Sequence, residues 1–370
     1  MRHVPVFELE EYFAEYQQGC SINIGSSGCR EFTLEGVLGM CGEDVLDLRN
    51  IPLTDSDPSG NYRLRSAVAS QYLGAEVDEI LMTHGSSEAL YLVMASLLRP
   101  GDQVITLTPC YQSLIDLPRL FDAEVVPIRL TFDDDYNFPT KKILARMESR
   151  TRMVVVNSPH NPTGTMITRN DFRTLAKKSA ETGVWLLCDE AFADIVHRGF
   201  HERCRRSLSD YCISVGTLSK SFGLTGLRVG WCYARRSLIN RMRAYKHFTT
   251  INLCPVTEYI ASAALGHRDR ILSCQRDLAQ QGLCELTRWI KGKLDWVPPR
   301  GGVCCYPRLP RGVDSDVFCR ALAKDYGVFL VPGSVFGNGE HVRLGFGFGA
   351  QHVLAGVKAI EELLAAWIPN

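Results

Sequence analysis

The stretches TRMVVVN (151–157), WLLCDE (185–190) and YCISVGTL (211–218) decide the fold. Each is a short run with an apolar centre, and polar or charged residues follow it at once. Runs of this kind are typical of parallel strands that are covered on both faces. Two further runs, QVITL (103–107) and EVVPIRL (124–130), come earlier, and helical patterns alternate with the runs. The sequence therefore predicts right-handed βαβ units and one open α/β sheet.

The pattern changes after Pro255. A long helical stretch without an obvious break is predicted from about residue 256 to 292, and further helices near 314–326 and 351–366. The intervening runs are short, which predicts a smaller α+β domain. We therefore expect three parts. They are an N-terminal segment packed with the small domain (1–40), a large domain (41–264) and the small C-terminal domain (265–370).

Composition narrows the class of protein. Lysine plus arginine and aspartate plus glutamate number 41 each among 370 residues, so no basic excess suggests a nucleic-acid partner. The N-terminus does not resemble a signal peptide, and no apolar run reaches the roughly 18 residues of a membrane span. Fourteen cysteines are scattered, with no Cys-x-x-Cys pair. We therefore expect reduced thiols, no metal site and a cytoplasmic location, without a membrane partner.

Polar clusters lie where ligands of such sheets bind, beyond the carboxyl ends of strands. Thr83-His84-Gly85-Ser86-Ser87 opens a helix, and backbone N–H groups at a helix start favour a phosphate. The Thr217 hydroxyl and Arg228 fit the same anion. Asp189 fits a protonated pyridine nitrogen, and Lys220 fits an imine. Each fragment alone is weak, but their combination on an α/β pattern is specific.

With these motifs in this order, the chain resembles the fold-type I pyridoxal-phosphate enzymes of the class I/II aminotransferase family over nearly its whole length. The resemblance implies a large domain with a mainly parallel central sheet and a small α+β domain. It also implies pyridoxal 5'-phosphate as the cofactor. The quaternary structure that it implies is a homodimer with the active site near the subunit boundary.

The resemblance also assigns site residues. It implies that Lys220 is the Schiff-base lysine and that Asp189 pairs with the pyridine nitrogen. It also implies that Asn161 donates to the ring oxygen and that Tyr111 stacks on the ring. The phosphate is assigned to Gly85, Ser86, Ser87, Thr217 and Arg228. Arg343, in HVRLGFG (341–347), is implied to bind the substrate α-carboxylate in a bidentate fork. Once the substrate amine has displaced it, Lys220 is expected to remove the Cα proton.

Two family positions are altered. Phe192 stands where the family has the tyrosine of Asp-x-x-Tyr, which is either a packing exchange or a way to retune the imine. Asp55 stands where the family has a tyrosine that reaches the partner subunit's phosphate. An acid is a poor phosphate partner. Asp55 therefore either makes a bond within its loop or faces a cationic substrate.

A narrower resemblance accounts for this pattern. SSGCREFT (26–33), GTLSKSFGLTGLRVGWC (216–232) and FLVPGSVFG (329–337) look like capreomycidine synthases, which cyclise a hydroxylated arginine. These enzymes eliminate the hydroxyl group, and the guanidine then adds to the resulting double bond. That subgroup has a histidine at the position of Arg30, and arginine cannot act as a general acid near pH 7. We therefore favour enduracididine formation from 4-hydroxyarginine over capreomycidine formation from 3-hydroxyarginine.

A guanidinium substrate needs an anionic contact. Glu8, Glu10 and Glu11 lie on an N-terminal amphipathic stretch, which is either a solvated charge run or a segment that folds over the site. Glu10 is our choice for the guanidinium contact, and Ser27, Asp55 and Asn161 are further candidate substrate contacts. His84 is either a packed histidine or a proton shuttle for the departing hydroxyl.

Other functions stay open at this stage. The first is an aminotransferase that acts on a basic amino acid, which would follow ping-pong kinetics with a 2-oxo acid. The second is a pyridoxal-phosphate-dependent arginine oxidase, which would consume dioxygen. A transcription regulator with an aminotransferase-like domain does not fit, because the motifs begin near residue 26 and the net charge is zero.

Overall fold

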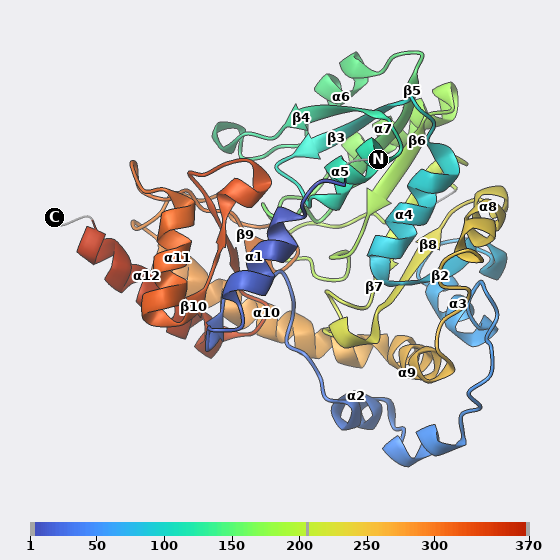
Figure 1. Cartoon of the computed structure of the whole chain (residues 1–370), viewed down its shortest axis with the longest axis horizontal. Coiled ribbons are helices and arrows are strands. Elements are labelled where there is room, and N and C mark those ends of the chain that lie inside the picture. Colours follow the sequence, from blue (N-terminus) through green and yellow to red (C-terminus); the bar gives the residue numbers. More distant parts are fainter. Residues whose placement is uncertain (1–3, 205–206, 368–370) are drawn as a thin grey trace.

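The computed structural model describes residues 4–204 and 207–367. Its largest element is a seven-stranded sheet in the order β2-β8-β7-β6-β5-β3-β4 (Figure 1). The strands, in that order, are Ile80–His84, Val229–Tyr233, Cys212–Thr217, Trp185–Asp189, Thr151–Asn157, Gln103–Thr108 and Glu124–Arg129. All five runs predicted from the sequence are strands of this sheet, and they pair in parallel. The α/β fold with a mainly parallel sheet is therefore confirmed.

The sequence patterns did not predict two strands of the sheet, β2 and β8. β8 runs antiparallel to both β2 and β7, and Trp231 of β8 is paired with Met82 on one side and Gly216 on the other. Both strands lie beside motifs that the sequence presents as ligand-binding turns, so their strand character was hidden. β2 delivers the chain to Gly85, where the next helix begins.

Helices cover both faces of the sheet because alternate strand residues point to opposite sides. Val104 and Val155 pack with α4 (Gly85–Leu97), α5 (Ser113–Leu120) and α8 (Arg236–Lys246). Ile105 and Val154 belong to the cluster on the other face, which includes residues of α6 (Thr140–Arg146) and α7 (Arg169–Thr182). α3 (Tyr62–Ala69) and α9 (Pro255–Gly266) cover Ile80 and Trp231 on the β2–β8 side.

The C-terminal part has its own small sheet, in the order β11-β12-β9. Those strands are Val331–Pro332, Val342–Gly345 and Cys304–Cys305, and α10 (Arg268–Ile290), α11 (Ser315–Tyr326) and α12 (Ala350–Trp367) surround them. The helical stretch predicted without a break from 256 to 292 was wrong in one respect, because α9 ends at Gly266 and α10 begins at Arg268. α10 then runs from α9 to the C-terminal part, where it packs against α12 (Figure 1).

The N-terminal residues contact both parts of the molecule. β1 (Ile22–Asn23) pairs in parallel with β10 (Val328–Phe329), and the Phe13 ring of α1 (Glu8–Tyr16) packs edge-on against Phe329 at 4.8 Å. α2 (Leu34–Cys41) packs instead against α9. Short 3-10 helices span Val45–Asn50, Val77–Glu79, Phe132–Asp134, Thr225–Leu227 and Gly333–Phe336.

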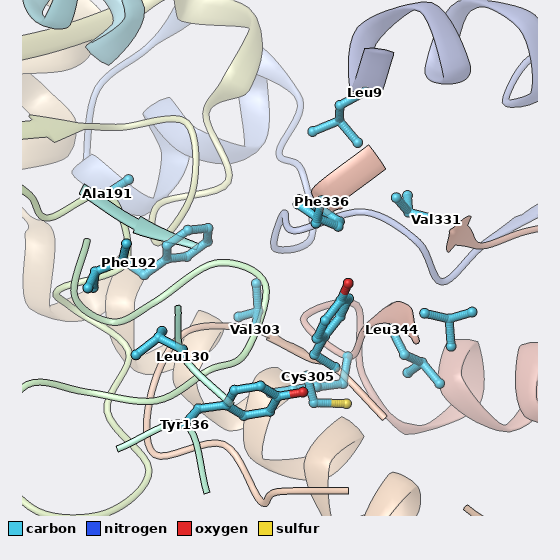
Figure 2. Close-up of a cluster of buried hydrophobic side chains, with 14 of the residues drawn as sticks. Leu9, Leu130, Tyr136, Ala191, Phe192, Val303, Cys305, Val331, Phe336 and Leu344 are labelled. Carbon is cyan, nitrogen blue, oxygen red and sulfur yellow. The ribbon is translucent and has the colours of Figure 1, made fainter. Parts of the chain in front are cut away.

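One apolar cluster joins these parts behind the strand ends. Figure 2 shows Phe192, from the turn after β6, near Val303, with Phe336, Leu344 and Leu9 of α1 in the same cluster. All five side chains are buried. Because burying a large apolar side chain contributes about 1.5–3 kcal/mol, this shared core fixes the walls of any cavity between the parts.

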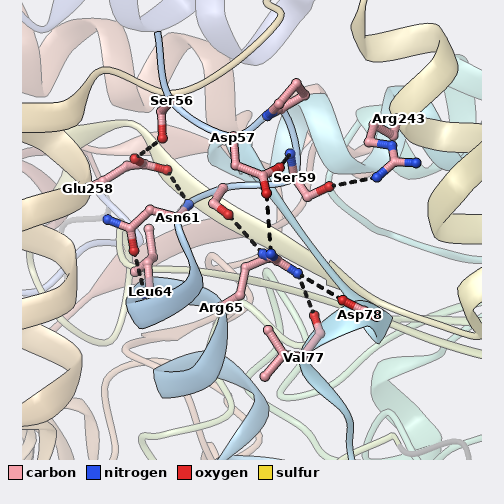
Figure 3. Close-up of polar contacts among 12 residues, drawn as sticks. Ser56, Asp57, Ser59, Asn61, Leu64, Arg65, Val77, Asp78, Arg243 and Glu258 are labelled. Carbon is pink, nitrogen blue, oxygen red and sulfur yellow. Dashed lines mark hydrogen bonds and ion pairs between the residues drawn. The ribbon is translucent and has the colours of Figure 1, made fainter. Parts of the chain in front are cut away.

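The segment before α3 is held by a polar network around Arg65 (Figure 3). The Arg65 guanidinium is almost buried, and it donates to Gly60 O at 2.8 Å and Val77 O at 3.2 Å. Asp57 and Asp78 each lie 3.4 Å from it. The network therefore fixes the turn that carries the chain from Asp55 into α3.

No helix in the described part of the chain is long and apolar enough to cross a membrane. Within the same residues no group of histidine, cysteine and acidic side chains is arranged to hold a metal ion. All fourteen cysteines are free thiols.

Gly230 generates a prediction about the β2–β8 pair. A Cβ atom at Gly230 would lie 2.3 Å from the carbonyl carbon of Gly85 and 2.5 Å from Ser86 N. We expect Gly230→Ala to lower the free energy of unfolding by about 1–3 kcal/mol, since two backbones must separate. A Cβ atom at Gly226 would meet no atom within 4 Å, so Gly226→Ala is the matched control. Urea unfolding measures both, and equal stabilities would contradict the close approach.

Candidate active site

A cavity of about 630 Å³ opens at the carboxyl ends of β5, β6 and β7. Its other walls come from α1, from the segment Ser26–Gly28 and from Arg343 of β12. Ten residues singled out in the sequence line it. They are Glu10, Ser27, Ser86, Ser87, Tyr111, Asn161, Asp189, Lys220, Arg228 and Arg343. Residues far apart in the chain thus converge on one space, as the strand-end rule requires.

Lys220 follows β7 and points its amine into this cavity. Its Nζ donates to Ser27 Oγ at 3.3 Å. Burial lowers the pKa of Lys220, and the nearby positive charge of Arg343 lowers it further. Both effects favour the neutral amine, which is the form that acts as a nucleophile or takes up a proton.

Asp189 is the last residue of β6 and is buried beside Lys220. Burial raises the pKa of Asp189 to about 6, although the Ala191 N–H bonded to Oδ1 at 3.1 Å and the charge of Lys220 oppose the shift. Within the described residues no cation forms an ion pair with its carboxylate. A desolvated carboxylate of this kind is complementary to a cationic group of a ligand.

An anion site lies at the start of α4. Ser86 and Ser87 line the cavity there, where the helix has free backbone N–H groups, and Gly85 takes a left-handed φ of 73°. Arg228 NH1 donates to Ser219 Oγ at 3.4 Å and to Thr225 O at 3.2 Å. No carboxylate in the described part of the chain pairs with Arg228. A helix start beside an uncompensated guanidinium fits a phosphate.

Arg343 is a second cation without an ion pair among the described residues. Its side chain is 1% exposed, Nε donates to Gly25 O at 3.0 Å, and NH1 donates to Asn161 Oδ1 at 3.2 Å. The rings of Phe13 and Phe336 flank the guanidinium at 6.0 and 5.4 Å. Burial lowers the pKa of Arg343, and no ion pair with a carboxylate of the described residues offsets this cost. Its charge is therefore available to a ligand carboxylate.

Three residues frame the space between these charges. Asn161 Oδ1 is occupied by Arg343, so the Asn161 amide NH2 is free for a ligand in the cavity. The Tyr111 ring lies 5.6 Å from the Phe7 ring, and burial, followed by the Glu10 charge, raises the pKa of Tyr111. Phe192 brings an apolar ring, without a hydroxyl group, to the same wall.

Four singled-out residues do not line the cavity of the protomer. Thr217 lies behind it and donates to Ser219 Oγ at 3.0 Å, and Gly85 packs against Arg228. His84 Nδ1 lies 3.3 Å from Glu88 Oε2, outside the lining. Asp55 accepts from Asn252 Nδ2 at 3.2 Å and lines a separate surface depression.

Some lining residues were not assigned a role from the sequence. Ser219 lies between two motif residues, so its position was a usable signal. Glu31 and Gln17 reach the cavity from the N-terminal segment, and Phe348 reaches it from the loop before α12. Their placement depends on how the N-terminal segment packs, which no local pattern encodes. Arg30 is exposed and lies outside the lining.

Comparison with known proteins adds to this geometry. The family model described as aminotransferase class I and II matches residues 55–360. The chain belongs to this family. As a family member it is 34% identical to a capreomycidine synthase from Streptomyces vinaceus, over 98% of this chain and 94% of that protein.

Solved structures of the family superpose over the whole chain. The PLP-dependent cyclase OrfR gives a TM-score of 0.92 at 32% identity, with 100% of this chain and 99% of that chain covered. A PLP-dependent aminotransferase from Streptococcus suis 89-1591 gives a TM-score of 0.95 at 26% identity, with full coverage of both chains. This family member is therefore an enzyme that uses pyridoxal phosphate.

The residues of the cavity fit this cofactor. Asp189 offers an unpaired buried carboxylate for a protonated ring nitrogen, and Lys220 offers a largely desolvated amine. The start of α4 and Arg228 offer a phosphate site. These groups match the ring nitrogen, the aldehyde and the phosphate of the cofactor.

The raised pKa of Asp189 predicts a pH-dependent stability of the cofactor-free protein. Folding desolvates this carboxylate, so its penalty is present above about pH 6 and is relieved as the pH falls toward 4, where the folded protein takes up the proton. Asp189→Asn removes the penalty. We expect the variant to unfold with a free energy up to about 3 kcal/mol higher at pH 7.5, with the difference vanishing near pH 4.

Urea unfolding of cofactor-free protein at several pH values measures this difference. Asp133→Asn, at an exposed position, is the matched control. A difference between Asp189→Asn and the wild type that does not change with pH would contradict the assignment.

Proposed function

We propose that the enzyme cyclises a hydroxylated L-arginine, with 4-hydroxyarginine as substrate and enduracididine as product. One observation carries the proposal. The cavity is lined by the buried Arg343, which has no ion pair among the described residues, by Lys220 and by the Glu10 carboxylate of α1. This arrangement suits an amino acid with a carboxylate at one end and a guanidinium at the other.

The relatives support the same reaction. The capreomycidine synthase and the PLP-dependent cyclase are both more than 30% identical to this chain over almost its whole length. Phe192 also supports it, because it removes a hydroxyl group from the wall near Asn161. Burial of Phe192 in the cluster of Figure 2 makes it a fixed part of the site.

The chain's own residues account for the steps. Arg343 binds the α-carboxylate and thereby orients the bond from Cα to hydrogen. The bound cofactor withdraws electron density from Cα, which makes that hydrogen acidic. Lys220 Nζ takes the proton from Cα, releases it to the conjugated system of the bound substrate and cofactor, and can then take one from Cβ. The γ-hydroxyl group receives a proton and leaves as water. A guanidine nitrogen gives up a proton as it bonds to Cγ, and Cβ and Cα are protonated again.

Our choice of the 4-hydroxylated substrate rests on Arg30. Addition at Cγ closes a five-membered ring, whereas addition at Cβ, after loss of a 3-hydroxyl group, closes a six-membered ring. Arg30 occupies the position at which capreomycidine synthases have a histidine. Its exposed side chain lies outside the cavity lining. This difference supports the 4-hydroxylated substrate.

Product analysis tests the proposed function. Purified enzyme is incubated with 3-hydroxyarginine, 4-hydroxyarginine or arginine, with and without pyruvate, and the products are identified by mass spectrometry and NMR. We expect a cyclic amino acid that is one water lighter, formed from 4-hydroxyarginine without pyruvate. A 2-oxo acid as the sole product would overturn the proposal in favour of transamination, or of an oxidase if dioxygen is consumed.

Glu10 generates a prediction about the guanidinium. An ion pair that is shielded when the substrate fills the cavity contributes about 1–2 kcal/mol, so Glu10→Gln should raise KM by roughly 5- to 30-fold. The change in KM should exceed any change in kcat, because Glu10 would contact the guanidinium and acts on Lys220 only through its charge. Glu11→Gln, on the same helix and outside the cavity lining, is the matched control. Steady-state kinetics with an unchanged KM for Glu10→Gln would remove Glu10 from the site.

We further propose that the enzyme acts as a homodimer. Asp55 lies outside its own cavity, near large apolar side chains that face solvent in the protomer, such as Tyr62 (70% exposed). A second copy that covers this surface would bring Asp55 toward the partner's site, where it could face the cationic end of the substrate. Sedimentation equilibrium measures the oligomeric state.

A further inference from the structure

The segment Ser26–Gly28 touches the amine that moves protons. Ser27 is 5% exposed, lines the cavity and accepts from Lys220 Nζ at 3.3 Å. Ser26 Oγ accepts from the Gly28 N–H at 3.0 Å, which fixes the turn. The chain just before this segment is bonded to β12, since Gly345 N donates to Ile24 O at 2.6 Å. Ser27 is therefore held in place against Lys220 by both local and distant bonds.

The proposed reaction needs an acid at the departing hydroxyl group. Hydroxide is a poor leaving group, so the oxygen has to receive a proton as its bond to carbon breaks. An arginine side chain cannot act as a general acid near pH 7. No histidine of the described chain lines the cavity, and His84 faces Glu88 outside it.

When the hydroxyl group departs, Lys220 holds the proton that it has taken from Cβ, but the hydroxyl group lies further along the substrate side chain. A hydroxyl side chain between the two atoms can accept one proton and donate another at the same time. Ser27 is the hydroxyl that the structure bonds to Lys220.

We propose that Ser27 is a catalytic residue that relays a proton from Lys220 to the departing hydroxyl group; this inference rests on the proposed function. The N–H bond of the Lys220 ammonium breaks and its proton passes to Ser27 Oγ. The original Ser27 proton passes to the substrate oxygen, and the carbon–oxygen bond breaks with its electron pair on oxygen. Water leaves, and Lys220 is again a neutral amine.

The electrostatics of the site agree with this direction of transfer. Burial is the main cause of the lowered pKa of Lys220, and the charge of Arg343 adds to it, so the Lys220 ammonium gives up its proton more readily than an exposed lysine. Each turnover also returns Lys220 to the neutral form that the next deprotonation needs.

Ser27→Ala tests the relay by separating two steps in deuterium oxide. Exchange of the Cα hydrogen reports proton removal by Lys220, and the yield of dehydrated product reports departure of the hydroxyl group. We expect Cα exchange to stay within a few fold of the wild type, and dehydration to fall by about 100-fold or more, as for loss of a general acid. Ser27→Thr keeps the hydroxyl group and should recover most of the activity. Ser21→Ala, at an exposed serine outside the cavity, is the matched control.

The outcomes are distinguishable. Equal losses of exchange and dehydration in Ser27→Ala would overturn the relay, because Ser27 would then only position Lys220. Unchanged dehydration would overturn it as well. If the wild type dehydrates neither hydroxyarginine, the proposed function itself fails.

A measurement on the cofactor-free protein tests the contact without catalysis. Because Ser27 Oγ accepts a hydrogen bond from the Lys220 ammonium, its removal should lower the pH at which Lys220 becomes reactive. Competitive acetylation of Lys220, followed by mass spectrometry across pH, reports this value. An unchanged profile in Ser27→Ala would show that the two groups do not interact and would overturn the relay.

Discussion

The hydrogen bonds of Arg343 connect three parts of the chain at the cavity. The residue belongs to the small C-terminal sheet, its Nε reaches the N-terminal segment at Gly25, and its NH1 reaches Asn161 beyond the large sheet. Burying a guanidinium is costly unless its donors are used. The fold therefore has to bring both acceptors to Arg343, and the cavity is the space left between the three parts.

Other charged or ionisable groups of the site also lack partners. Arg228, Arg343, Asp189 and Lys220 are charged or ionisable groups that the described residues leave without opposite partners at bonding distance. Desolvation makes the positions of Arg343, Asp189 and Lys220 unfavourable by themselves, whereas Arg228 is exposed. A ligand with a phosphate, a protonated ring nitrogen, an aldehyde carbon and a neighbouring carboxylate relieves all four at once. The cavity thus gains binding energy from groups whose burial costs stability before the ligand arrives.

The sequence predicted the parts of this structure that depend on local patterns. The five parallel strands have apolar runs of the right length, and residues at or after the ends of β3, β5, β6 and β7 converge on the cavity. The pair β2–β8 was missed because Gly85 and Gly230 make the segments look like turns, although these glycines let two backbones approach. The junction at His267 was missed because both neighbouring helices continue the same apolar pattern.

Side chains that depend on long-range packing were harder to foresee. Glu31 and Gln17 reach the cavity only because β1 pairs with β10, a contact between residues about 300 positions apart. Asp55 shows the opposite case. Its neighbours in sequence match a family motif, but in the protomer it is bonded to Asn252 and lies outside the cavity. Motif position fixes where a residue is in the chain, and packing decides which space its side chain enters.

The N-terminal helix α1 has a consequence for how such enzymes diversify. Phe7, Glu10, Phe13 and Gln17 supply a wall of the cavity, yet none of them belongs to the sheet that holds the cofactor residues. α1 is attached through Leu9, through the Phe13–Phe329 contact and through Gln112, which donates to Val6 O. Substitutions on one short helix can therefore reshape this wall while the side chains at the strand ends stay the same. The two sets are linked by charge at one position, since burial lowers the pKa of Lys220 and the charge of Glu10 acts to raise it.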